Sequence, residues 1–268
     1  MSNQWQKLGL LYCPQASGRH PKLKTHAANP LPVQIQGDLY RIFYSARDDE
    51  NRSSVAAVDI DIATGLVVED HYQPFFEHGP AGSFYAEGVS IGCCYEVDQQ
   101  RYLLFMGWQN ATEGHWRGDI GRLRLWYGST RSWDAGNGEM LHVINGAESS
   151  NGHDWSRQGL AVPFELGTAQ AFSKPSVVRD RRSGNYSMWF SCRGGGGDSY
   201  RIGYATSEDA IDWRLDNANA GISVSADGWD SAMIEYPHVF DHGAQRYMLY
   251  NGNDYGKSGF GLAVLNNG

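Results

Sequence analysis

The chain has 268 residues with a formal net charge of −8, and apolar residues make up 41% of it. This apolar share is enough for a packed core and excludes wholesale disorder. The acidic balance argues against a protein that neutralises phosphates, so no nucleic-acid partner is expected. No run approaches the about 20 apolar residues of a membrane span, and the first residues, MSNQWQKLGLLYC, hold no signal-peptide core, which predicts a cytoplasmic location.

Five segments along the chain resemble one another, each an aromatic and aliphatic strand that runs into a polar turn. They are YRIFYSARD (Tyr40–Asp48), YLLFMGWQN (Tyr102–Asn110), RLWYGSTRSW (Arg124–Trp133), YSMWFSCRG (Tyr186–Gly194) and YMLYNGND (Tyr247–Asp254). The first and second start 62 residues apart, and so do the third and fourth, whereas the second and third start only 22 apart. The chain is therefore built on an internal repeat with one irregular step.

A second set of strands comes before most of these segments, often with a small or polar cluster and a proline. They are HAANPLPVQI from His26, AEGVSIGCCYEV from Ala86, FSKPSVVRD from Phe172 and IEYPHVFDH from Ile234. A unit of about 60 residues with three or four antiparallel strands is typical of a propeller blade. The pattern predicts an all-β protein, a single β-propeller domain over residues 1–268.

The irregular step leaves the number of blades open. Between Asp119 and Tyr127 most of one repeat is absent, so the ring is either a five-bladed plan with one truncated or merged blade, or a four-bladed one. The strand Leu8–Tyr12 has no hairpin partner of its own and is expected to complete the last blade and close the ring. A defective blade would expose a strand edge, which makes a homodimer possible.

A propeller gathers the openings of its first strands and the loops after its second strands into one cup, where binding residues are expected. The candidate acid–base carboxylates there are Asp48, Glu87, Asp230 and Glu235. Arg47, Arg193 and Lys257 are candidates to hold an anionic group. Further candidates for substrate binding are His26, Asn29, His238 and, as stacking platforms, Trp108 and Tyr255. The histidines lack metal-ligand spacing, so neither a metal site nor a cofactor is expected.

The motifs HAANP, YSARD, GSFYAEGVS, FSKPSV and IEYPHVF resemble the blade signatures of five-bladed glycosidase propellers. Those are glycoside hydrolase families 43, 32 and 68, with family 130 as a cousin. RIGYATSEDAIDW, SADGWDSAMIEYPHVFD and YNGNDYGKSGFGLAVL look closer still to small propellers of polysaccharide biosynthesis clusters, similar to the N-terminal region of glucosamine inositolphosphorylceramide transferase. The resemblance implies a carbohydrate or sugar-nucleotide ligand, and it alone allows for calcium in the central channel.

The resemblance also assigns roles to individual residues. The general acid of those families stands in a Glu-x-Pro motif, which Glu235, Tyr236 and Pro237 match. The hydrolases have an Asp as base or nucleophile at the opening of the first blade, where this chain has Asn29, and an amide does not accept a proton near neutral pH. Glu87 matches the second carboxylate, and Asp48 is the other candidate base.

Three functions follow from these observations. The first is a carbohydrate-active enzyme that acts on a glycoside or an activated sugar in surface-polysaccharide metabolism, by hydrolysis or glycosyl transfer. The second is a non-catalytic sugar-binding or scaffold propeller, which the replacement by Asn29 favours. The third is an interaction propeller without a carbohydrate ligand, which a cup without aromatic platforms would indicate.

Overall fold

A computed structural model describes residues 3–15, 17–97, 100–108, 124–148, 155–180, 183–195 and 197–266. The regular secondary structure of this part of the chain is almost entirely β-strand, as the sequence predicts. It forms two compact units, of which the first is Met1–Gly9, Gly121–Asn253 and Gly261–Gly268, and the second is Leu10–Ile120 and Asp254–Phe260. The single domain over 1–268 stays a prediction.

The second unit is built from antiparallel neighbours in chain order. Its elements are η1 (Pro21–Leu23), β2 (Thr25–Gln36), β3 (Leu39–Arg47), β4 (Ser53–Asp61), β5 (Leu66–Phe76), β6 (Gly88–Val97) and β7 (Gln100–Trp108). The strands β2, β3, β4 and β5 form one meander, and β6 pairs with β7. A single parallel pair, Ser53 with Gly88, links the two groups. This grouping into short antiparallel sheets agrees with the repeat in the sequence.

The first unit contains the same kind of groups. Its elements are β8 (Arg124–Ser132), β9 (Leu141–Glu148), β10 (Ser156–Leu160), β11 (Ala171–Arg179), β12 (Tyr186–Arg193), β13 (Arg201–Ser207), β14 (Arg214–Leu215), η2 (Asn217–Asn219), β15 (Glu235–His242) and β16 (Gln245–Asn251). The strands β8, β9 and β10 are antiparallel neighbours, as are β11 to β14. One parallel pair, Ala171 with His142, joins these two groups.

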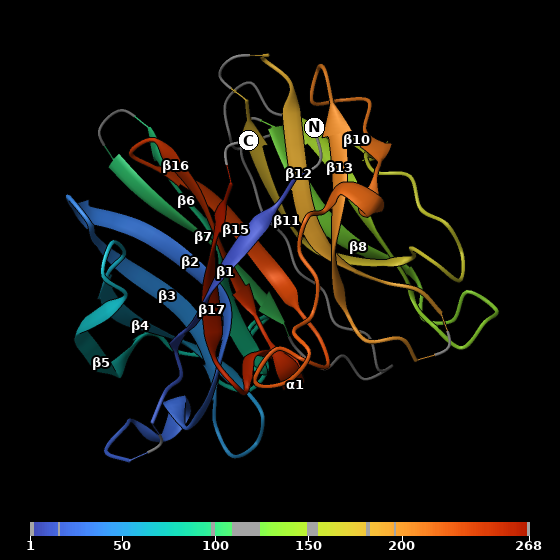
Figure 1. Cartoon of the computed structure of the whole chain (residues 1–268). Coiled ribbons are helices and arrows are strands. Elements are labelled where there is room, and N and C mark those ends of the chain that lie inside the picture. The colour runs from blue at the N-terminus through green and yellow to red at the C-terminus, as the bar shows by residue number, and fades with distance from the viewer. Residues whose placement is uncertain are drawn as a thin grey trace. The chain divides into compact units, whose positions relative to one another are not determined.

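The last sheet joins both ends of the chain. Its order is β1 (Trp5–Tyr12), β17 (Phe260–Leu265), β16 and β15, and Figure 1 shows β1 beside β17. The N-terminal strand therefore pairs with the last strand, as expected, but it begins at Trp5 rather than Leu8. The earlier start has a physical reason, because the Trp5 ring is buried edge-on against Trp189, with centroids 5.5 Å apart. The number of blades and the closure of the ring stay predictions.

The core of the first unit explains why its strand sequences are apolar on both faces. On β12, Met188 and Phe190 pack into one cluster, with Phe172 and Ile144, whereas Trp189 between them packs into another. Successive side chains of a strand point to opposite faces, so both faces of β12 are buried. Burial on both sides produces a continuous apolar run instead of an alternating one.

Candidate functional site

Three strands open with the same backbone irregularity, in which the residue before a proline is left-handed. Asn29, Lys174 and Tyr236 have φ values of 55°, 51° and 51°, and the antiparallel register shifts at each of them. Positive φ is uncommon in residues other than glycine, and strained positions of this kind cluster at functional sites. Each bulge re-aims the side chains at the opening of β2, β11 or β15.

Glu235 is the first residue of β15, directly before the bulge at Tyr236, and it is completely buried. The backbone on both sides of it is held by hydrogen bonds. The N–H of Ile234 donates to the carbonyl oxygen of Tyr200 over 3.2 Å, and the N–H of Tyr236 donates to the hydroxyl oxygen of Ser191 over 2.7 Å. A carboxyl group on a backbone fixed in this way suits a reaction that needs one orientation of the acid.

Arg193, at the end of β12, contacts the same segment through a shared neighbour. Its guanidinium carbon lies 4.6 Å from the centroid of the Tyr200 ring, and its Nη2 donates to a carboxylate oxygen of Glu139 over 2.8 Å. Tyr200 therefore contacts Arg193 with its ring and the residue before Glu235 with its carbonyl oxygen. The structure brings these two predicted site residues into one region.

Glu139 and Gln170 are residues that sequence reasoning missed. Glu139 is buried beside Arg193, and the fully buried amide of Gln170 donates to Oδ1 of Asn137 and to the carbonyl oxygen of Met140. This network holds the turn that carries Glu139 against the opening of β11. Its contacts join residues 33 and 54 positions apart, so no local pattern in the sequence marks them.

His238 is the fourth residue of β15 and lies near Lys174 of β11. Burial, followed by the positive charge of Lys174, lowers the pKa of the His238 imidazole to about 3. The ring is therefore neutral at physiological pH, with one nitrogen that donates and one that accepts hydrogen bonds. This is a suitable state for binding an uncharged hydroxyl group.

Asp230 was expected in the sugar site, but the structure places it in an internal ion pair. Its Oδ2 accepts hydrogen bonds from Nζ of Lys7 over 2.6 Å and from the hydroxyl of Tyr250 over 3.0 Å. Burial raises the pKa of Asp230, but hydrogen bonds from Lys7 and Ser225 outweigh it and hold the pKa below its usual value. These contacts attach the N-terminal part of β1, around Lys7, to the rest of the first unit.

In the second unit, three predicted residues come together at the opening of β2. The pKa of His26 is lowered to about 4, chiefly by burial and then by the positive charges of Arg47 and Lys257. The negative charge of Asp254 raises this pKa, but by less. Nδ1 of His26 lies 2.8 Å from the hydroxyl oxygen of Thr25. A neutral imidazole close to two cations can bind sugar hydroxyls or an anionic substituent.

Two further predicted residues belong to this unit. Asn29 lies on the same strand as His26, at the left-handed bulge. Tyr255 lies in the short turn α1 (Asn253–Gly256), where it and Asp254 are both left-handed and its side chain is 39% exposed. Its exposure is compatible with stacking on a sugar ring.

Asp48 was a candidate base, and the structure shows it buried in a brace of the β3–β4 turn. Its carboxylate accepts hydrogen bonds from the backbone N–H of Arg52 over 2.8 Å and from Nε of Arg52 over 2.9 Å, and it lies 3.3 Å from Nε2 of His78. Burial raises the pKa of Asp48, but the hydrogen bonds and the charge of Arg52 lower it by more. The pKa of Asp48 is therefore below its usual value. A carboxylate engaged in this way is a weak base.

Glu87 lies directly before β6, and Trp108 is the last residue of β7. The N–H of Glu87 donates to the carbonyl oxygen of Trp108 over 3.0 Å, and the Glu87 carbonyl oxygen accepts from the N–H of Ser53 over 3.3 Å. Both Glu87 and Trp108 are half-buried. The Trp108 ring lies so close to Gly88 that no Cβ would fit there, which assigns at least part of this ring to packing. The rest of the expected loop, residues 109–123, lies outside the described residues.

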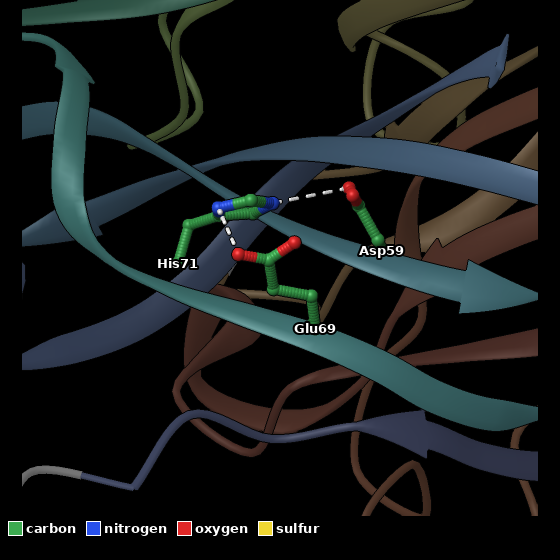
Figure 2. Close-up of side chains that lie close together, drawn as sticks. All are labelled: Asp59, Glu69 and His71. Atoms are coloured by element: carbon green, nitrogen blue, oxygen red, sulfur yellow. Dashed lines mark ion pairs between the residues drawn. The ribbon is translucent and has the colours of Figure 1, made fainter.

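Among the described residues, Asp59, Glu69 and His71 form a group whose ligand atoms lie within 4.8 Å of one another. Figure 2 shows His71 between the two carboxylates, with Nε2 3.3 Å from Asp59 and Nδ1 3.6 Å from Glu69. Arg41 already donates to both oxygens of Asp59, each over 2.8 Å. A cation would compete with this guanidinium, so the group is better suited to bracing β4 against β5 than to holding a metal.

Solved structures of glycoside hydrolases share this fold. A glycosyl hydrolase from Bacteroides ovatus matches with a TM-score of 0.69 and 10% identity, over 98% of this chain and 94% of that one. A second match is a structure from the GH130 family of mannoside phosphorylases, a family that contains glycoside hydrolases targeting β-1,2 mannosidic linkages in Candida mannan. Its TM-score is 0.66 and its sequence identity 10%, over 98% of this chain and 94% of that one. The arabinofuranosidase PaAbf62A from Podospora anserina, in complex with cellotriose, matches with a TM-score of 0.62 and 12% identity, over 99% of this chain and 98% of that one. The chain therefore has a glycoside-hydrolase-like fold.

Sequence relatives are found over the full chain. The uncharacterized proteins Rv1502 and MT1551 of Mycobacterium tuberculosis are each 38% identical to it, over 98% of this chain and 99% of each relative. The chain belongs to the same family as these two proteins. No known family model matches the sequence. Among the described residues no helix has the length and apolar character needed to cross a membrane.

Proposed function

We propose that the protein is a carbohydrate-active enzyme that acts on a glycoside or an activated sugar in surface-polysaccharide metabolism, by hydrolysis or by glycosyl transfer. The observation that carries this proposal is the position of Glu235. Glu235 is fully buried at a strained strand opening, in a fold shared with glycoside hydrolases. Its neighbour Ile234 is hydrogen-bonded to Tyr200, whose ring contacts Arg193.

In the proposed reaction, Glu235 is the general acid that protonates the oxygen of the leaving group. Cleavage of a glycosidic bond uses a second carboxylate as base or nucleophile, and Glu87 is the better candidate. Asp48 ranks below it because Arg52 and His78 already engage its carboxylate.

The proposed binding residues have distinct tasks. Arg193 orients an anionic part of the donor or the substrate, and the neutral ring of His238 binds a hydroxyl group. Around His26, the cations Arg47 and Lys257 offer a second place for an anionic substituent. These chemistries suit a sugar nucleotide or an acidic oligosaccharide.

The test is the substitution Glu235→Gln, which keeps the shape of the side chain and removes the acidic proton of the carboxyl group. Turnover is measured on a panel of sugar nucleotides and acidic oligosaccharides, and binding is measured by calorimetry. We expect kcat to fall by at least about 100-fold, the usual scale of general acid catalysis, with binding retained. Glu208→Gln, at an exposed position, is the matched control. Turnover that persists in Glu235→Gln overturns the assignment.

A second candidate is a non-catalytic sugar-binding propeller, which Asn29 favours because an amide replaces the base of the related hydrolases. This candidate predicts that the wild-type protein binds ligands from the panel but turns none of them over. Asn29→Asp distinguishes the two further, since a gain of hydrolysis in that variant would show a site that lacks only its base.

A further inference from the structure

The first unit contains a pocket of about 540 Å³ whose lining residues, apart from Arg193, have no assigned role. It lies between the residues that join β12 to β13 and those of η2 and the segment after it. Polar groups of its lining include Arg193, Asp198, Arg201, Asn217 and Ser223, and Ala218 of η2 lies at the same wall. The volume falls in the range of about 300–1,000 Å³ that is usual for small-molecule sites.

Both walls of the pocket are held in place by the protein itself. Oδ1 of Asn217 accepts a hydrogen bond from the N–H of Tyr204 over 3.0 Å, and its amide donates to Sγ of Cys192 over 3.8 Å. On the other wall, Nη1 of Arg201 donates to the carbonyl oxygens of Tyr200 and Ala232, over 2.9 and 3.0 Å. A ligand would therefore meet a preformed surface and pay little for ordering it.

The lining next to these walls is formed by small, uncharged groups. A Cβ at Gly203 would lie 2.5 Å from the Phe190 ring and 2.9 Å from Oδ1 of Asn217, so glycine is needed to keep this surface open. Burial raises the pKa of the Cys192 thiol to about 12, which keeps it neutral. The charged groups of the lining are thus the two arginines and Asp198.

The mixture of donors and acceptors indicates the class of ligand. Guanidinium and amide groups donate hydrogen bonds, the Asp198 carboxylate accepts them, and the Ser223 hydroxyl does both. A sugar hydroxyl also donates and accepts, so neighbouring hydroxyls of a neutral sugar match this set. Phosphate is less suitable, because it would meet the negative charge of Asp198.

We propose that this pocket binds a neutral sugar unit, as an accessory subsite for the carbohydrate on which Glu235 acts. The link to Glu235 rests on the proposed function, whereas the binding of a sugar does not. Arg201 of the lining donates to the carbonyl oxygen of Ala232, three residues before Glu235. Tyr200, its neighbour in the chain, accepts from the N–H of Ile234, directly before Glu235. A longer ligand held in the pocket would thus extend along the segment that leads to the acid.

The test measures binding of methyl α-D-glucopyranoside, methyl α-D-mannopyranoside and methyl β-D-galactopyranoside by saturation-transfer NMR and titration. Ala218→Trp fills the pocket from an exposed position, and Asp198→Asn removes its carboxylate with little change of shape. We expect a Kd at least about tenfold weaker in both variants, the loss of one good contact. Ala63→Trp, on the exposed β4–β5 turn of the second unit, is the matched control and should bind as the wild type does.

Each outcome decides the proposal. It is overturned if the wild type binds none of the three glycosides, if both pocket variants bind them unchanged, or if inorganic phosphate alone binds. Should Ala218→Trp fail to fold, as judged by its thermal unfolding, Asp198→Asn decides. Glu235→Gln should leave the Kd of the monosaccharides unchanged. Retained turnover in that variant would refute the role of Glu235 as general acid and would leave the proposal for the pocket intact.

Discussion

The hydroxyl oxygen of Ser191 accepts a hydrogen bond from the backbone N–H of Tyr236 over 2.7 Å. This bond connects β12 to the left-handed residue that follows Glu235, and Ser176 of β11 likewise accepts one from the N–H of Val239 over 2.8 Å. Two serines of one antiparallel group thus satisfy backbone donors of the next one. The bulge that positions Glu235 is held by a neighbouring group of strands.

Replacement of this serine should weaken both the fold and the site. Ser191→Ala leaves the N–H of Tyr236 without its acceptor, so we expect the free energy of unfolding to fall by about 1–3 kcal/mol in urea titrations. Turnover should fall more than binding, because Glu235 loses its fixed backbone. Ser231→Ala, which removes only an exposed turn hydrogen bond, should stay within about 0.5 kcal/mol of wild type. Equal stability of the two variants would contradict this account.

The ion pair between Lys7 and Asp230 is expected to matter for stability. Asp230→Ala removes the acceptor of the Tyr250 hydroxyl and the counter-charge of the Lys7 ammonium, which keeps only the Ser225 hydroxyl oxygen as an acceptor. This loss should cost about 3 kcal/mol, measured by chemical denaturation. Replacing both partners by apolar residues, Lys7→Met with Asp230→Leu, should recover part of this loss, since no buried charge then remains. A double variant less stable than Asp230→Ala would refute the ion pair as the cause.

The variant Asp48→Asn distinguishes a structural role of Asp48 in the β3–β4 turn from a role as the catalytic base. The amide cannot accept all the hydrogen bonds that the carboxylate receives from Arg52, so the melting temperature should fall. At a temperature where both proteins are folded, kcat should stay within about twofold of wild type, because the base is proposed to be Glu87. A selective loss of kcat with an unchanged melting temperature would reassign the base to Asp48.

Stability should decrease as the pH falls from about 6.5 towards 4. The pKa values of His26 and His142 are lowered to about 4 and that of His238 to about 3, all chiefly by burial, against about 6.5 in the unfolded chain. Between these values the unfolded chain binds protons that the folded chain does not, so the histidines favour unfolding increasingly as the pH falls. Denaturation midpoints measured across this window report the slope, which His142→Gln should reduce. A flat profile would contradict the shifts.

The sequence alone was sufficient for the β-architecture and for several local features. The aromatic repeats predicted the strands β3, β12 and β16, because a strand needs only a local run of apolar and β-branched residues. The proline after Asn29, Lys174 and Tyr236 marks three strand openings, although the left-handed backbone before it was visible only in the structure. The lone N-terminal strand was also correctly paired with the last one.

The partners of charged and polar side chains were decided by the tertiary structure. Asp48, Asp230 and Glu235 look equivalent as acidic residues in a sequence, yet the first is bound by Arg52, the second by Lys7 from the other end of the chain, and the third lies fully buried at a bulge. Local chain preferences act over a few residues, whereas electrostatics and burial depend on residues that meet only after folding. For that reason the sequence determined which strands form, and the folded structure alone determined the surroundings of each carboxyl group.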